Sequence, residues 1–205
     1  MGLYAKYVIP RITHLLCSAK QIGRQREKVV PRAEGRVLEV GIGSGLNLPF
    51  YAAGKVQHLW GLDPSKEAWV LAQQAVAQAE FDVEFIESTA EDIPLDNGSA
   101  DSVVVTYTLC SIPAILPALG EMRRVLKPGG RLIFCEHGSA PDEAVRRWQN
   151  RLNPIWKRLS GGCNLNVPIP SLLERAGFKI GAMDAMYMPG WKPASFNYWG
   201  TAISP

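Results

Sequence analysis

The hydrophobic residues of this chain fall into short apolar runs separated by amphipathic segments. The apolar runs predict strands near residues 36–41, 56–62, 82–87, 101–107 and 130–137. Segments with helical spacing of apolar residues lie between them, near 46–53, 65–79 and 114–126. The run at 101–107 is rich in valine, as expected of a strand that is buried on both faces. This alternation predicts an α/β domain built on a mostly parallel sheet.

Both ends of the chain depart from this alternation. Residues 3–29 predict one or two short helices, with breaks near Pro10 and Gly23. The chain after residue 138 predicts a basic amphipathic segment, a short helix and two antiparallel closing strands, at 141–159, 169–176, 178–188 and 195–203. We therefore expect a single domain in which residues 1–35 form a helical lid or cap and residues 36–205 form the core.

Composition narrows the class of protein. Of the 205 residues, 47% are apolar and 20% are charged, and the net charge of +3 is too small to indicate a nucleic-acid partner. Residues 1–36 hold eight Lys or Arg against two Glu, which fits an anionic membrane surface, an anionic substrate or a solvated helix face. The four cysteines form no C-x-x-C pair, so we expect no metal site, no disulfide and a reducing cytoplasm. No apolar run is long enough to span a bilayer.

The stretch from Val37 to Gly45 carries the strongest chemical signal. It reads as a buried strand followed by a glycine turn, and Asn47 then begins a predicted helix, so free backbone N–H groups point at a ligand. The G-x-G-x-x-G dinucleotide pattern fails, because leucine stands at the last position in either register. Glu39 lies two residues before the first glycine, where a carboxylate repels a pyrophosphate and suits a cationic group such as an α-ammonium.

Four motifs in order support one family. The acidic-x-G-x-G-x-G pattern at 39–45 is followed by Gly61-Leu62-Asp63, by the loop and strand at 90–105 and by the helix end, turn and strand at 125–132. Together they resemble the class I S-adenosylmethionine (SAM) methyltransferases over nearly the whole chain. The resemblance implies a three-layer, Rossmann-like, seven-stranded and mostly parallel sheet with an antiparallel C-terminal strand, and SAM as the cofactor.

The resemblance also implies roles for individual residues. The glycines would approach the methionine and ribose, Asp63 would accept hydrogen bonds from the ribose hydroxyls, and the backbone of Ala90 would meet the adenine. Thr106 lies where a backbone carbonyl holds the ammonium in relatives. Many relatives have Asp where this chain has Thr89, so Glu91 is an alternative contact for the adenine amino group. The predicted cofactor residues are Glu39, Gly41, Gly43, Gly45, Asp63, Pro64, Thr89, Ala90, Glu91 and Thr106.

A second, more local resemblance concerns the methyl acceptor. Glu136-His137, the segment 148–165 and Thr108–Ser111 look like the mammalian alkyl-thiol methyltransferases, which implies a small lipophilic thiol as substrate. His137 is the predicted base and Cys110 is predicted to face the methyl group; a strand-end histidine and a packing cysteine are the structural alternatives. The predicted substrate contacts are Tyr107, Trp148 and Asn164.

Two other functions stay open from the sequence. One is a phospholipid or quinone methyltransferase that contacts a membrane peripherally through the basic N-terminal segment. The other is a protein that binds SAM without catalysis, which only the replacement of Asp by Thr89 favours. The sequence does not assign an oligomeric state.

Overall fold

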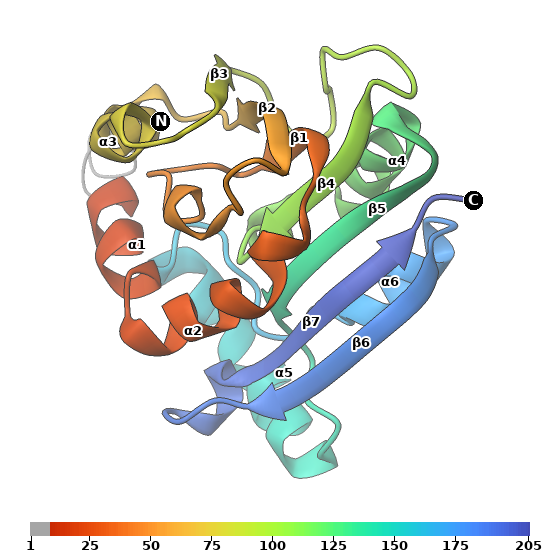
Figure 1. The fold of residues 1–205 in the computed structure, drawn as a ribbon. Helices are drawn as coiled ribbons and strands as arrows, with labels where there is room; N and C mark the ends of the chain where they lie inside the picture. The colour runs from red at the N-terminus through yellow and green to blue at the C-terminus, as the bar shows by residue number, and fades with distance from the viewer. Residues whose placement is uncertain (1–8) are drawn as a thin grey trace.

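The computed structural model describes residues 9–205, with side chains from Arg11 onward. Its centre is a seven-stranded sheet in the order β3-β2-β1-β4-β5-β7-β6 (Figure 1). The strands are β1 Gly35–Val40, β2 Val56–Leu62, β3 Asp82–Ile86, β4 Ala100–Thr106, β5 Leu126–His137, β6 Lys179–Tyr187 and β7 Phe196–Ile203. Neighbouring strands from β3 to β5 pair in parallel, whereas β7 is antiparallel to both β5 and β6. The predicted fold class, with its antiparallel C-terminal strand, is confirmed.

Helices cover both faces of this sheet and complete the three layers (Figure 1). Helices α1 Ile9–Cys17, α2 Lys20–Val29 and α3 Lys66–Ala77 lie on one face. Helices α4 Ile115–Val125, α5 Glu143–Leu159 and α6 Ile169–Arg175 lie on the other. None of the helices from residue 9 onward combines the length and the apolar character that crossing a bilayer requires.

Alternate residues of the central strands build two separate apolar layers. Val103 and Val105 of β4 pack into the layer that includes α4 and α6, while Val104 packs into the layer shared with α2 and α3. Leu38 and Val37 of β1 divide in the same way. Both faces of each central strand are therefore buried, which is why the sequence shows continuous apolar runs there rather than alternation.

The helix predicted at 46–53 is wrong. The structure has only a short 3-10 turn, η3 Leu48–Phe50, because two nearby side chains are drawn inward. The amide of Asn47 and the hydroxyl of Tyr51 both donate to the buried carboxylate of Glu39, at 3.0 and 2.8 Å. The tertiary contacts of this segment therefore replace a regular helix.

The helix break predicted at Gly23 is also wrong, and the start of the 3–29 prediction lies outside the described residues. Helix α2 runs through Gly23, and the break lies at Ser18–Ala19, between α1 and α2. A Cβ at position 23 would lie 3.7 Å from the Phe50 ring, an ordinary van der Waals distance, so the packing of α2 here has room for a small side chain. Pro10 is the second residue of α1, where a helix tolerates a missing N–H, and the residues before α1 lie outside the described chain, so the break predicted near Pro10 stays a prediction.

Candidate functional site

The glycine turn after β1 forms one wall of a cleft at the carboxyl ends of the strands. Gly41 and Gly43 have positive φ angles of 76° and 51°. A Cβ at Gly41 would lie 2.4 Å from the Thr108 side chain, so the turn packs directly against the loop after β4. A Cβ at Gly43 would meet nothing closer than 3.9 Å. The turn therefore leaves open space beside Gly43, where a ligand can approach the backbone.

Asp63, directly after β2, fixes the position of this turn. Its carboxylate accepts hydrogen bonds from the backbone N–H groups of Gly43 at 3.0 Å and Ser65 at 2.8 Å. Burial raises the pKa of Asp63, and the two N–H donors partly oppose that rise. A carboxylate held at the C-terminal edge of β2 has further lone pairs that a ligand hydroxyl can use, and the ribose contact stays a prediction.

Glu39 is the centre of a buried polar network under the cleft. It is 1% exposed, and its oxygens accept hydrogen bonds from Asn47 and Tyr51. The Asn47 amide also donates to the Thr106 hydroxyl at 3.0 Å. Burial raises the pKa of Glu39 to about 7 despite these donors. The sequence did not single out Asn47 or Tyr51 as site residues, although a polar residue between Leu46 and Leu48 was a usable signal.

The cleft has a volume of about 240 Å³ and draws its lining from both predicted and unpredicted residues. The predicted residues in its lining are Glu39, Gly41, Gly43, Asp63, Thr106 and Tyr107. Within the described chain, its lining does not include the other predicted cofactor residues, Gly45, Pro64, Thr89, Ala90 and Glu91. The carboxylate of Glu91 instead accepts the N–H of Ala114 at 3.1 Å, next to the start of α4, so its side chain supports a helix.

Helices α1 and α2 close the cleft from the side. Thr13, His14 and Cys17 of α1 and Arg26 of α2 belong to its lining. His14 Nδ1 lies 2.7 Å from the Ser44 hydroxyl of the glycine turn, and the Arg26 guanidinium donates to the Cys17 carbonyl at 2.6 Å. The basic segment noted in the sequence therefore contributes a cation, Arg26, to the cleft.

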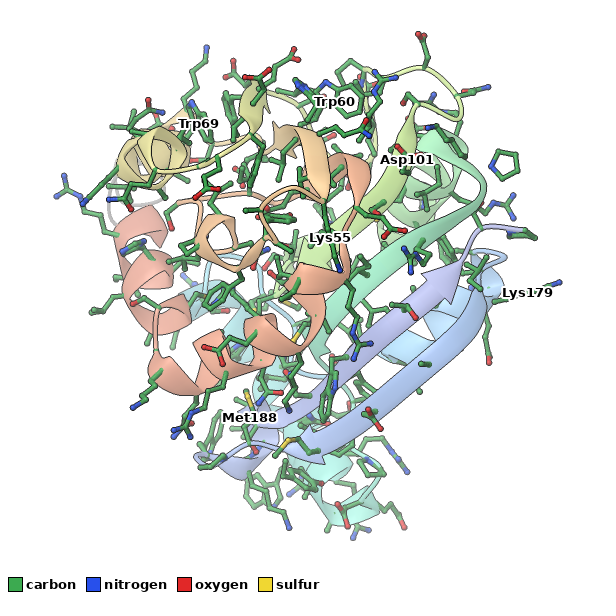
Figure 2. All side chains as sticks on the ribbon, viewed as in Figure 1. Lys55, Trp60, Trp69, Asp101, Lys179 and Met188 are labelled. Atoms are coloured by element: carbon green, nitrogen blue, oxygen red, sulfur yellow. The ribbon has the colours of Figure 1, made fainter. Side chains whose placement is uncertain are left out.

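Tyr107 holds a strained backbone at the rim of the cleft. With φ at 53°, it is the one non-glycine residue in the described chain with a positive φ. The Arg26 guanidinium lies over its ring at 5.4 Å, and its hydroxyl donates to the sulfur of Met188, which follows β6 (Figure 2), at 3.9 Å. Backbone strain of this kind persists where surrounding contacts enforce it, and it gathers at ligand sites.

Next to the cleft, folding brings together Cys110, His137 and Cys163, which we call the Cys-His cluster. Their potential ligand atoms all lie within 4.8 Å of one another, and His137 Nε2 is 3.1 Å from Cys163 Sγ. A hydrogen bond from Cys110 and the nearby imidazole hold the pKa of Cys163 below its usual range. Burial lowers the pKa of His137, but the Cys163 sulfur raises it on balance. The sequence analysis did not predict this cluster, because the cysteines have no C-x-x-C spacing.

Two of the predicted substrate residues, Asn164 and Trp148, differ in their burial and contacts. Asn164 lines a second cavity, and its amide donates to the carbonyls of Cys110 at 2.9 Å and Gly162 at 3.1 Å. It therefore ties the 161–165 loop to the turn that carries Cys110. Trp148 is 56% exposed on α5, beside Ala144, Arg147 and Arg151, so its position gives no support to the predicted role.

The second cavity, of about 560 Å³, adjoins the cleft. The larger part of its lining is apolar, with Ile112, Pro113, Ile115, Val167 and Leu172, and Lys157, Asn164 and Asn166 add polar groups. Ser111 lines both the cleft and this cavity. The site thus combines a cleft built around a buried acid and a glycine turn with an adjacent apolar space.

Comparison with known proteins identifies the family of this chain. The family described as "Methyltransferase domain" matches residues 38–134. Thiol S-methyltransferase TMT1B of Homo sapiens is 34% identical over 176 residues, covering 83% of this chain and 72% of that protein. Demethylmenaquinone methyltransferase of Clavibacter sepedonicus is 34% identical over 119 residues, covering 58% and 48% of the two chains. Across four thiol S-methyltransferase relatives, the chain spans 65–72% of their length.

Among solved structures, a methyltransferase described as putative, from Bacillus halodurans, superposes with a TM-score of 0.73 at 15% identity. The match covers 89% of this chain and 97% of the other, and at this identity it shows a shared fold. The matched residues 38–134 contain Glu39, the glycine turn, Asp63 and Thr106, which together shape the cleft. The chain belongs to the SAM-dependent methyltransferases, with S-adenosyl-L-methionine as its cofactor.

Proposed function

We propose that the protein transfers the methyl group of SAM to the sulfur of a small lipophilic thiol. The observation that carries this proposal is the apolar cavity that meets the cofactor cleft at Ser111. An aliphatic acceptor fits a lining of Ile112, Ile115 and Leu172, and its sulfur would reach the junction beside the Cys-His cluster. The thiol S-methyltransferase relatives support the same class of acceptor.

The cofactor side of the site fits SAM. The open space beside Gly43 admits the ligand to the backbone, Asp63 faces that space, and the Glu39 network suits an ammonium group nearby. SAM supplies a methyl group on a positively charged sulfur, so the protein needs chiefly to align the acceptor and exclude water. In this proposal the α1–α2 segment acts as the lid, because Thr13, His14, Cys17 and Arg26 complete the cleft wall.

A labelled-methyl assay over matched six-carbon acceptors tests this function. We expect transfer to hexanethiol well above transfer to hexylamine or hexanol, with phenol and a demethylated quinol included in the panel. Ile115→Trp, which fills the apolar cavity, should reduce thiol turnover with little change in SAM affinity. Ile155→Trp is the matched control, because Ile155 is 64% exposed on α5. Equal turnover of the thiol and the amine would contradict the proposal.

A second candidate is a quinone methyltransferase that works at a membrane surface. The observation that favours it is the outer face of α1, where Leu15 is 72% exposed and Leu16 is 62% exposed. Basic residues in the same segment would add attraction to anionic lipid. The relative named demethylmenaquinone methyltransferase supports the same chemistry.

Vesicle binding separates the two candidates. If the second is right, phosphatidylglycerol vesicles should bind the protein and stimulate transfer to a demethylated quinol, and the double variant Leu15→Ser, Leu16→Ser should lose both effects. Thiol transfer that is independent of vesicles, together with no transfer to the quinol, would exclude it.

A further inference from the structure

We propose that Cys110, His137 and Cys163 bind one zinc ion, with the fourth coordination position open to the sulfur of the acceptor thiol. The assignment of the fourth ligand rests on the proposed function, whereas the zinc site itself does not. Two thiolates and one imidazole are ligands that zinc favours, and three protein ligands with one open position are typical of catalytic zinc.

The geometry of the cluster is close to that of a zinc site. In a tetrahedral centre with Zn–S near 2.3 Å and Zn–N near 2.0 Å, ligand atoms lie roughly 3.5–3.8 Å apart. Here His137 Nε2 and Cys163 Sγ are 3.1 Å apart, and every pair lies within 4.8 Å. Small side-chain rotations are therefore enough to reach ligand distances.

The backbone around the cluster is firmly held. Both the N–H and the side-chain amide of Asn164 donate to the Cys110 carbonyl, at 2.8 and 2.9 Å. This pair of bonds fixes the Cys163 loop against the turn that carries Cys110. His137 is the last residue of β5 and pairs with Asn197 of β7. Three elements that are distant in sequence thus present their ligands from rigid positions.

Two buried polar groups beside the cluster have unused bonding capacity. Glu136 is fully buried; one carboxylate oxygen accepts the N–H groups of Thr108 and Leu109, and Oε2 has no protein partner. The indole Nε1 of Trp156, which faces Cys163, is likewise buried without a hydrogen bond of good geometry. An unpaired buried carboxylate oxygen is costly unless positive charge lies nearby. A divalent cation in the cluster would supply that charge, and an N–H donor suits a metal-bound thiolate.

The place of the cluster favours an open fourth position. Cys110 Sγ lies 3.6 Å from the Ser111 hydroxyl, and Ser111 lines both the SAM cleft and the apolar cavity. Gly162, beside Cys163, also lines that cavity. A thiol whose alkyl chain occupies the cavity would therefore place its sulfur between the cluster and the cleft.

Zinc at this position would deprotonate the acceptor thiol, which the reaction requires. A thiol that coordinates zinc loses its proton, here to solvent, and remains a nucleophile at neutral pH. A lone pair of its sulfur then forms the new bond to the methyl carbon. The bond between that carbon and the sulfonium sulfur breaks, and its electrons stay on the departing thioether. His137 would then act as a ligand and not as the base that the sequence predicted.

Metal analysis of the full chain tests the site without any activity assay. After expression with zinc and dialysis under reducing conditions, we expect one zinc equivalent per chain by elemental mass spectrometry. Cys163→Ser and His137→Gln should lose it. Cys17→Ser is the matched control, because Cys17 is near the cluster but outside it, and it should keep its zinc. Zinc should also protect the half-buried Cys163 from alkylation in the unaltered protein, a readout that does not depend on how the variants fold.

Cobalt substitution tests the fourth position. Cobalt-loaded protein should show a thiolate-to-metal charge-transfer band that grows on addition of hexanethiol and is absent in Cys163→Ser. Metal-free wild-type protein in which added zinc does not protect Cys163 would overturn the site, and metal loss in Cys17→Ser would overturn the open position. If the protein methylates thiols but its cobalt spectrum does not change when the thiol is added, only the assignment of the fourth ligand would be overturned. Stoichiometric zinc without transfer to thiols would instead remove the proposed function.

Discussion

At the scale of single residues, Asp63 both lines the cleft and holds the backbone of the glycine turn. Its carboxylate holds the N–H of Gly43 and the N–H of Ser65. We expect Asp63→Ala to lower SAM affinity by about ten- to a hundredfold, since hydrogen bonds to charged groups contribute about 1.5–3 kcal/mol. Calorimetric titration with SAM measures this loss. Asp82→Ala, at the exposed start of β3, is the control, and unchanged affinity in the Asp63 variant would remove its assigned role.

Gly43 and Gly54 form a natural pair for separating ligand contact from backbone strain. Both have positive φ, at 51° and 78°, and neither has an atom within 3.8 Å of an added Cβ. Alanine at either site should cost about 1–2 kcal/mol of folding free energy. Only Gly43→Ala should abolish SAM binding, because only Gly43 lines the cleft. Urea denaturation and SAM titration of both variants check this, and similar SAM affinities would count against the open space as the ligand site.

The raised pKa of Glu39 predicts a pH dependence of stability. Burial raises this pKa from 4.5 to about 7, while Tyr51, Asn47 and Arg26 oppose the shift and Asp63 adds to it. Between those values the folded state binds more protons than the unfolded state, so this group's contribution to stability falls as pH rises, by about 3 kcal/mol in all. Urea denaturation at about pH 5 and about pH 8 should show this loss in wild type and less of it in Glu39→Gln. Burial also raises the pKa of Glu136. Because Glu136 is present in wild type and in Glu39→Gln, its contribution is the same in both and does not affect the difference between them.

At the scale of elements, the side chain of Asn164 makes three of the hydrogen bonds that hold the loop at 161–165. Asn164 donates to the carbonyls of Cys110 and Gly162 and accepts from the amide of Asn153. Asn164→Ala should lower the unfolding free energy by about 1–3 kcal/mol, because partners in a partly buried site lose their bonds. Asn166→Ala is the control, since Asn166 makes an exposed bond to Asn150. Equal stability of the two variants in thermal unfolding would contradict this anchoring role.

Elements whose shape follows from local sequence were predictable. Strand β2 matches its predicted residues, and β1, β3, β4 and α3 agree within one or two residues. The α3 start follows from Ser65, whose hydroxyl accepts the N–H of Ala68 at 3.1 Å as a helix cap. The segment at 46–53 was not predictable in this way, because its shape is set by Asn47 and Tyr51 reaching Glu39.

At the scale of the whole molecule, cofactor binding should stabilise the fold. A ligand that binds only the folded state adds about 2.7 kcal/mol at a hundredfold excess over Kd. SAM should therefore raise the thermal unfolding temperature in a concentration-dependent way, and NADH should not, since the glycine pattern lacks the dinucleotide register. Differential scanning fluorimetry with both compounds checks this. A shift with NADH of the same size would contradict the identified cleft.

The sequence by itself determined the succession of strands and helices along the chain, the glycine turn with its preceding acid, and the place of Asp63 at the end of a strand. These features are encoded within a few neighbouring residues, through apolar runs, glycine conformations and caps. Only the tertiary structure decided that Cys110, His137 and Cys163 meet, that Asn47 and Tyr51 bind Glu39, and that Trp148 faces solvent. Each of these contacts depends on which distant segments pack together. The spacing of residues along the chain does not determine that packing.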